Sequence, residues 1–211
     1  MRIVDLSHTV SPNMPVYPGT EQPIFITGCS IEEIGFLEKK ITMYSHTGTH
    51  VDAPAHLIKD ASTLDLLSIE HFHGSALMLN FENDKSKTID VSSLEPYEKE
   101  IEIIDFLLIH TGWSKHWGTE KYFSDYTVLT LEAANWLSEF QLKGFGLDTI
   151  SADISETDDY PIHKILLKKN TIIIENLINL LSLPSSTFTF SCFPIKFEDA
   201  DGSPVRAVAY V

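Results

Sequence analysis

The sequence predicts an α/β fold, because buried strands and an amphipathic helix alternate along the middle of the chain. Residues 75–81 and 106–110 are continuous apolar runs, which are typical of strands covered on both faces. Residues 130–137 begin with a capping threonine and then space their apolar residues as a helix does, and another strand is expected at 145–148. Strand, helix and strand in this order predict a sheet with some parallel pairing.

The segments on either side add further strands and turns. β-branched and aromatic residues predict strands at 23–27, 37–44, 170–177, 188–190, 193–197 and 205–211. A helical turn is expected within residues 64–72, and a short helix is expected to begin at His163. The acidic segment 199–203 is expected to be a solvated turn between the last strands. Because no linker or internal repeat interrupts the 211 residues, we expect a single domain over residues 1–211.

The charge and cysteine content exclude several classes of function. Thirty acidic and fifteen basic residues give a net charge of −15, which opposes binding to nucleic acid or to an anionic membrane surface. No stretch approaches the roughly 20 apolar residues that cross a bilayer, and Asp5 follows Met1 too closely for a signal peptide. Cys29 and Cys192 lie far apart in the sequence, which favours reduced thiols and a cytoplasmic location.

Residues 45–56, SHTGTHVDAPAH, place three imidazoles and a carboxylate around a glycine. Neutral imidazole and carboxylate suit zinc, manganese or iron, and His46, His50 and Asp52 would leave one coordination position open for water. Threonine, glycine, valine and proline disfavour a helix here, so we place the ligands where the strand at 37–44 ends. Spacing alone leaves a second interpretation open, in which some of the nine histidines cluster by chance.

Two aromatic residues, Tyr17 and Trp113, lie in loops of the kind that form pocket walls. Tyr17 lies in the proline-stiffened loop 11–19, where it either faces a pocket or packs on the prolines. Trp113 follows the strand at 106–110, and loops at strand ends commonly form sites. Trp113 therefore either lines a pocket or belongs to the core.

The ligand segment also resembles a known family. Residues 46–56 match the HxGTHxDxPxH signature of the cyclase-like metal-dependent hydrolases, which include bacterial kynurenine formamidase and isatin hydrolase. Other segments resemble family segments in the same order, namely residues 5–7, 14–19, 111–113, 146–148 and 170–177. The resemblance covers nearly the whole chain. It implies a swivelling β/β/α fold in which a mixed, barrel-like sheet is flanked by helices.

The resemblance also implies the composition of the site. Its metal ligands would be His46, His50, Asp52, His163 and Glu175. The first two histidines would bind one divalent ion, the later histidine would bind a second, and the carboxylates would bridge the pair, with zinc expected first and manganese second. His56 would remain free as general acid/base, and Tyr17 would contact substrate. The histidines that match no family ligand, His8, His71 and His73, are expected to be structural.

The expected activity is hydrolysis of an amide bond in a small-molecule substrate by metal-activated water. The first hypothesis is an arylformamidase that converts N-formylkynurenine to kynurenine and formate in tryptophan catabolism. The alternative is a hydrolase that opens a cyclic amide, imide or lactone such as isatin, since Tyr17 stands where kynurenine formamidases typically have tryptophan. A metal-bearing binding protein without turnover is a remote third. We also expect a homodimer or homotetramer.

Overall fold

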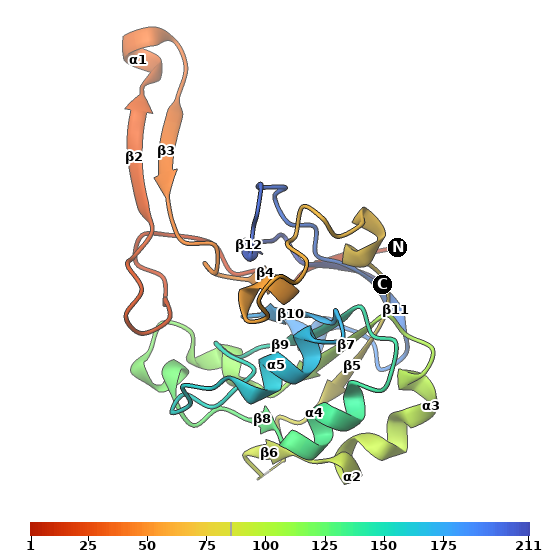
Figure 1. The fold of residues 1–211 in the computed structure, drawn as a ribbon. Helices are drawn as coiled ribbons and strands as arrows, with labels where there is room; N and C mark the ends of the chain where they lie inside the picture. The colour runs from red at the N-terminus through yellow and green to blue at the C-terminus, as the bar shows by residue number, and fades with distance from the viewer. Residues whose placement is uncertain (85) are drawn as a thin grey trace.

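A nine-stranded mixed sheet forms the body of the protein in the computed structural model, which describes residues 1–84 and 86–211 (Figure 1). In spatial order its strands are β1 (Ile3–Asp5), β13 (Val208–Tyr210), β11 (Phe188–Ser191), β5 (His73–Asn80), β7 (Phe106–His110), β9 (Gly144–Leu147), β10 (Ile172–Glu175), β4 (His50–Asp52) and β12 (Gly202–Pro204). Strands β5, β7, β9 and β10 run parallel, and the strands on either side of them pair antiparallel. The expected α/β class and mixed, barrel-like sheet are confirmed.

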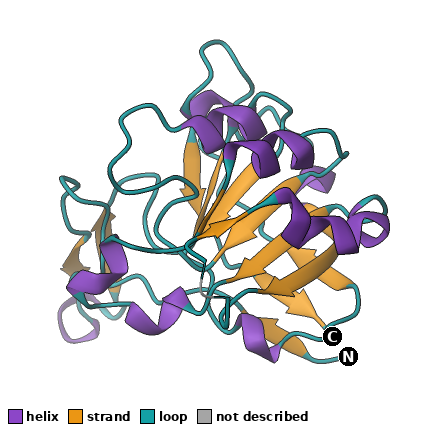
Figure 2. Ribbon diagram, turned by 90° about the horizontal axis from the view of Figure 1, so that it is seen from below, coloured by secondary structure: helices purple, strands orange, loops and turns teal. Residues whose placement is uncertain are grey.

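Helices cover one face of the parallel strands (Figure 2). They are α2 (Val91–Leu94), α3 (Glu98–Ile101), α4 (Leu131–Leu137) and α5 (Pro161–Leu167). Because side chains alternate across a strand, Leu107 and Ile109 of β7 pack with α4 and α5, while Phe106 and Leu108 join a second core on the opposite face. The expected helix at 130–137 is present, and the Thr130 side chain accepts a hydrogen bond from the Ala133 amide.

Several short turns and one small sheet complete the body. Turns of 3-10 helix lie at Pro54–His56, Ile69–Phe72, Glu95–Tyr97, Trp113–His116, Glu120–Phe123 and Leu180–Ser182, so the helical turn expected within 64–72 is present. Strands β6 (Thr88–Ile89) and β8 (Val128–Leu129) form a separate parallel pair. None of the helices in the described part of the chain has the length and apolarity that crossing a membrane requires.

A hairpin, which we call the arm, projects away from the body (Figure 1). It consists of β2 (Ile24–Cys29), α1 (Ile31–Ile34) at its tip and β3 (Glu38–Thr42), and its strands pair with each other rather than with the main sheet. The strand expected at 37–44 therefore does not run directly into the ligand strand. A loop at residues 43–49 returns the chain from the arm to β4.

The C-terminal segments differ in part from the expectation. Residues 193–197 make no strand, because Pro194 has no amide donor and forms only an isolated bridge with Val205. Gly202 and Ser203 were expected in a turn, yet they belong to β12 and pair with β4. This extra strand places the acidic segment 199–201 against the ligand strand.

Candidate metal centre

Strand β4 lies between β10 and β12, which brings distant residues onto one side of it. Glu175 of β10 is opposite His50, and Gly202 of β12 is opposite Asp52. Between them Val51 is fully buried in the core, so His50 and Asp52 share the other face of the strand. The sheet register therefore places two carboxylates and an imidazole together.

His46 reaches the same place from the loop before β4. The loop turns at Gly48, whose φ of 68° is a left-handed conformation that favours glycine. The His46 ring lies against Gly202, where a Cβ would be only 2.5 Å from the ring carbon Cε1. Glycine at position 202 is thus needed for the ring to occupy this position.

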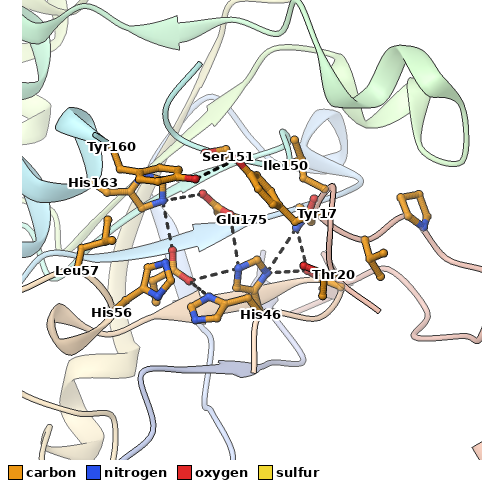
Figure 3. Close-up of a pocket in the computed structure, with 16 residues that line it drawn as sticks. Tyr17, Thr20, His46, His56, Leu57, Ile150, Ser151, Tyr160, His163 and Glu175 are labelled. Atoms are coloured by element: carbon orange, nitrogen blue, oxygen red, sulfur yellow. Dashed lines mark hydrogen bonds and ion pairs between the residues drawn. The ribbon is translucent and has the colours of Figure 1, made fainter. Parts of the chain in front are cut away.

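Asp52 and Glu175 each present their two oxygens to different histidines. Figure 3 shows Glu175 beside His163. Oδ1 of Asp52 is 2.6 Å from His46 Nδ1 and 3.3 Å from His50 Nε2, while Oδ2 is 3.6 Å from His163 Nε2. Oε2 of Glu175 is 3.5 Å from His50 Nε2, and Oε1 is 3.1 Å from His163 Nε2. Asp52 therefore lies between the pair His46 and His50 on one side and His163 on the other, and Glu175 lies between His50 and His163.

The far nitrogens of two histidines are already used as donors. His50 Nδ1 lies 2.8 Å from the carbonyl oxygen of Gly48, and His163 Nδ1 lies 2.7 Å from Asp153 Oδ2. When these nitrogens donate, the Nε2 atoms of the neutral rings face the Asp52 and Glu175 carboxylates with lone pairs. A lone pair facing an anion is repulsive unless a cation lies between them. The set of donors thus fits divalent metal, with outer partners that orient each ring.

The charges of the cluster shift several pKa values. Burial opposes the charged form of Asp52, but neighbouring His46, His50 and His163 hold its pKa well below the usual range. Burial would lower the pKa of His163, yet hydrogen bonds to carboxylates, including Asp153, raise it well above the usual value. Burial likewise opposes charge on His46, and its two carboxylate neighbours raise its pKa to about 10. The side chains around Asp52, His46 and His163 therefore strongly favour a positive charge between the carboxylates and the imidazoles.

His56 lies beside the cluster at the end of the 3-10 turn Pro54–His56. Its ring centroid is 4.0 Å from that of His46 and 6.3 Å from that of His163. Its Nδ1 atom is 3.4 Å from Asp201 Oδ2, which leaves Nε2 without a protein partner among the described hydrogen bonds. Burial lowers the pKa of His56, which favours the neutral imidazole.

A cavity of about 280 Å³ opens over these residues. Its floor contains the imidazoles and carboxylates, and its walls include Pro15, Val16, Tyr17, Thr20, Leu57, Ile150 and Tyr160 (Figure 3). Tyr17 therefore faces the cavity, as the first interpretation of its loop predicts, and its hydroxyl lies 3.3 Å from that of Tyr160. No lysine or arginine is among the described residues that line the cavity.

Trp113 is not among the described residues that line this cavity. It packs against the same cluster of buried side chains as Tyr17, and its indole nitrogen donates to the Tyr122 carbonyl oxygen at 3.1 Å. Trp113 is partly buried and lines a second cavity together with Lys115 and Lys121, so its contact with substrate stays a prediction. The remaining histidines, His8, His71, His73, His110 and His116, lie outside the groups that could hold a metal among the described residues, and Cys29 and Cys192 are unpaired.

Two carboxylates that contact the histidines of the site were not singled out in the sequence analysis. Asp153 accepts hydrogen bonds from the amides of Ile162 and His163, so it fixes the start of α5 as well as the His163 ring. Asp201 was assigned to a solvated turn, but its Oδ2 atom is 2.9 Å from His46 Nε2. Asp201 is 155 residues from His46, and Asp153 is ten residues from His163, and neither spacing corresponds to a local motif used in the sequence analysis.

The comparisons with known proteins agree with this geometry. A family model named Cyclase, with the description "Putative cyclase", matches residues 4–154. This chain belongs to the cyclase family. Kynurenine formamidase of Bacillus cereus is 31% identical over 206 residues, which cover 97% of this chain and 95% of that protein, and the Erythrobacter litoralis kynurenine formamidase is 29% identical over 211 residues, covering 98% and 93%.

A solved structure of a similar protein confirms the fold. The structure of isatin hydrolase A from Labrenzia aggregata bound to benzyl benzoate superposes with a TM-score of 0.90 at 27% identity. The alignment covers 99% of this chain and 93% of that one. The expected family and fold are thus confirmed, and the relatives support the expected class of metal-dependent hydrolase.

Proposed function

We propose that this cyclase-family chain is an arylformamidase that hydrolyses N-formylkynurenine to kynurenine and formate. The observation that carries the proposal is the pair Asp52 and Glu175, each of which presents one oxygen to His163 and the other to His50. Full-length similarity to kynurenine formamidases supports the substrate. The substrate is a small aryl amide, which suits a cavity of this volume.

The proposed centre holds two divalent ions. His46 and His50 would hold one ion and His163 would hold the other, with Asp52 and Glu175 as the carboxylates shared between them. Two of the groups that could hold an ion share Asp52, which supports a bridging role. Zinc is the first choice and manganese the second, because an imidazole and carboxylate set accepts both metals.

The side chains then divide the work of hydrolysis. Bound divalent ions supply Lewis acidity toward a carbonyl oxygen and lower the pKa of water. His56 takes a proton from the attacking water at Nε2 and returns one to the departing nitrogen. Tyr17 provides a flat aromatic face on which the aryl ring of the substrate packs.

A hydrolase that opens a cyclic amide such as isatin is the second candidate. N-formylkynurenine has an α-carboxylate, whereas isatin is neutral. The described lining of the cavity contains no lysine or arginine to pair with a carboxylate. This lining and the structural similarity to isatin hydrolase A both support a neutral bicyclic substrate such as isatin as the second candidate.

Side-by-side hydrolysis rates on the metal-loaded protein test the substrate. We expect measurable hydrolysis of N-formylkynurenine, and isatin and a simple lactone serve as comparison substrates. Turnover of isatin without turnover of N-formylkynurenine would transfer the proposal to the second candidate. Absence of turnover on every substrate by fully metal-loaded protein would favour a binding protein instead.

We also propose that the chain forms a homodimer or homotetramer through its arm. A two-stranded hairpin is only marginally stable alone in water, so the arm needs further contacts. The apolar side chains of Ile31, Phe36 and Leu37 at its tip are 63%, 54% and 58% exposed, and such an apolar patch is typical of an interface. The occupant we infer is a second copy of this chain. Lys39 and Lys40 on β3 have no partner among the described ion pairs, so acidic side chains of a second copy can pair with them locally.

Light scattering during size-exclusion chromatography tests the arm. The double variant Ile31→Ser/Phe36→Ser is expected to shift a dimer or tetramer toward the monomer, because it removes apolar area at the tip. Ile103→Ser is the matched control, since Ile103 is 75% exposed on the body away from the arm. A monomeric wild-type protein, or an unchanged mass in the double variant, would contradict the proposal.

A further inference from the structure

The backbone around Asp201 is fixed against the ligand strand. Its carbonyl oxygen accepts a hydrogen bond from the Ala53 amide at 2.8 Å, and the next residue, Gly202, pairs with Asp52. On the other side Ala200 is buried, and its carbonyl oxygen accepts from the Leu64 amide at 2.9 Å. The Asp201 side chain therefore leaves the backbone at a defined place, directly beside the metal centre.

One oxygen of Asp201 contacts two histidines of different proposed roles. Oδ2 is 2.9 Å from His46 Nε2 and 3.4 Å from His56 Nδ1. Among the described ion pairs, Asp201 pairs with these two rings and with no lysine or arginine. Asp201 is not among the described residues that line the cavity, so its route to the chemistry is through the histidines.

The contacts determine which nitrogen of each ring is free. A neutral imidazole has one N–H and one lone pair, so a ring that donates from one nitrogen offers the lone pair at the other. When His46 donates from Nε2 to Asp201, its Nδ1 lone pair is directed to the side of Asp52. When His56 donates from Nδ1 to the same oxygen, its Nε2 lone pair remains free to accept a proton.

We propose that Asp201 is a positioning residue that holds both histidines in these tautomers. The metal ligand His46 and the general acid/base His56 then depend on one carboxylate. The inference rests on the metal centre proposed above and assigns a role to a residue outside it. An aspartate that orients a catalytic imidazole is an arrangement known from other hydrolases.

A different arrangement of the same atoms is less favourable. Ligand atoms of His46, His56 and Asp201 lie within 4.8 Å of one another and so could hold a further ion. His46 cannot give Nε2 to that ion while Nδ1 binds the first one, unless its ring loses both protons. Hydrogen bonds from two neutral rings to one carboxylate require no such loss.

The variant Asp201→Asn tests the inference without a known substrate. Chelator competition on the zinc-loaded protein is expected to show roughly 10- to 100-fold weaker zinc binding, as is usual when an outer partner of a ligand is lost. In ¹⁵N NMR spectra of the imidazoles, His56 should lose its uniform Nδ1–H tautomer. Asp199→Asn is the matched control, because Asp199 is exposed in the same turn and its φ of 55° suits asparagine.

A second variant and a kinetic measurement separate positioning from general damage. Asp201→Ala removes the acceptor altogether and should weaken zinc binding at least as much as Asp201→Asn, with the thermal unfolding midpoint of each variant as the check on folding. With a hydrolysed substrate and saturating zinc, kcat should fall about 10-fold or more while KM stays nearly constant, because Asp201 lies outside the cavity lining.

The outcomes distinguish this inference from the proposed function. A wild-type protein without zinc affinity would overturn the metal centre itself. Wild-type zinc affinity and an unchanged His56 tautomer in Asp201→Asn would overturn only the role of Asp201. Loss of one whole equivalent of zinc in that variant, with the His56 tautomer unchanged, would replace positioning by a further ion site.

Discussion

The His50→Ala variant is expected to lose bound metal and hydrolytic activity together. His50 is 3% exposed, and its Nε2 atom lies within 3.5 Å of both Asp52 and Glu175, so the variant removes the imidazole nitrogen that faces both carboxylates. Removal of His50 also takes a compensating partner away from the negative charges of two buried carboxylates, Asp52 and Glu175. Elemental analysis after metal loading should find about two divalent ions per wild-type chain and fewer in the variant.

His73→Ala serves as the control for the loss of an imidazole. His73 is exposed at the start of β5 and lies outside the groups that could hold a metal among the described residues. The metal content and activity of the His73→Ala variant should match those of the wild type. Full metal occupancy in His50→Ala would refute the assignment of His50 as a ligand.

Replacement of His56 is expected to separate turnover from metal binding. A general acid/base contributes roughly 10²–10⁴-fold to rate, so His56→Ala or His56→Asn should lower kcat by that factor. Metal content should remain nearly unchanged, because the ring contacts Asp201 rather than Asp52 or Glu175. A variant that purifies without metal would instead make His56 a ligand, and the division of roles would have to be redrawn.

The parts of the site that lie close together in the sequence were predictable from it. Residues 46–56 contain His46, His50, Asp52 and His56, whose types suit a metal, and the family resemblance was needed to choose this interpretation over a chance cluster of histidines. The buried strands were recognisable because parallel strands covered on both faces are continuously apolar. His163 and Glu175 followed only from the family resemblance, since no local pattern relates them to residue 46.

Other features depend on the path of the chain in space. Asp201 belongs to an acidic run that reads as solvated surface, and only the pairing of β12 with β4 turns its side chain toward the histidines. Asp153 likewise acts across the turn that precedes α5. The arm has the composition of an ordinary hairpin, and nothing in its sequence pattern shows that it leaves the main sheet. Side-chain direction in loops is set by long-range pairing, which a local pattern does not encode.

Because β4 lies between β10 and β12, the complete set of candidate ligands exists only in the folded protein, so the supply of metal would affect how much of the protein is folded. In the unfolded chain only the histidines and the aspartate of residues 46–56 stay near one another, while His163 and Glu175 are far away. An ion that uses the complete set therefore binds the native state more tightly than the unfolded chain. Such preferential binding raises the free energy of unfolding by mass action. Scarcity of metal would then reduce how long the protein survives proteolysis as well as how fast it works.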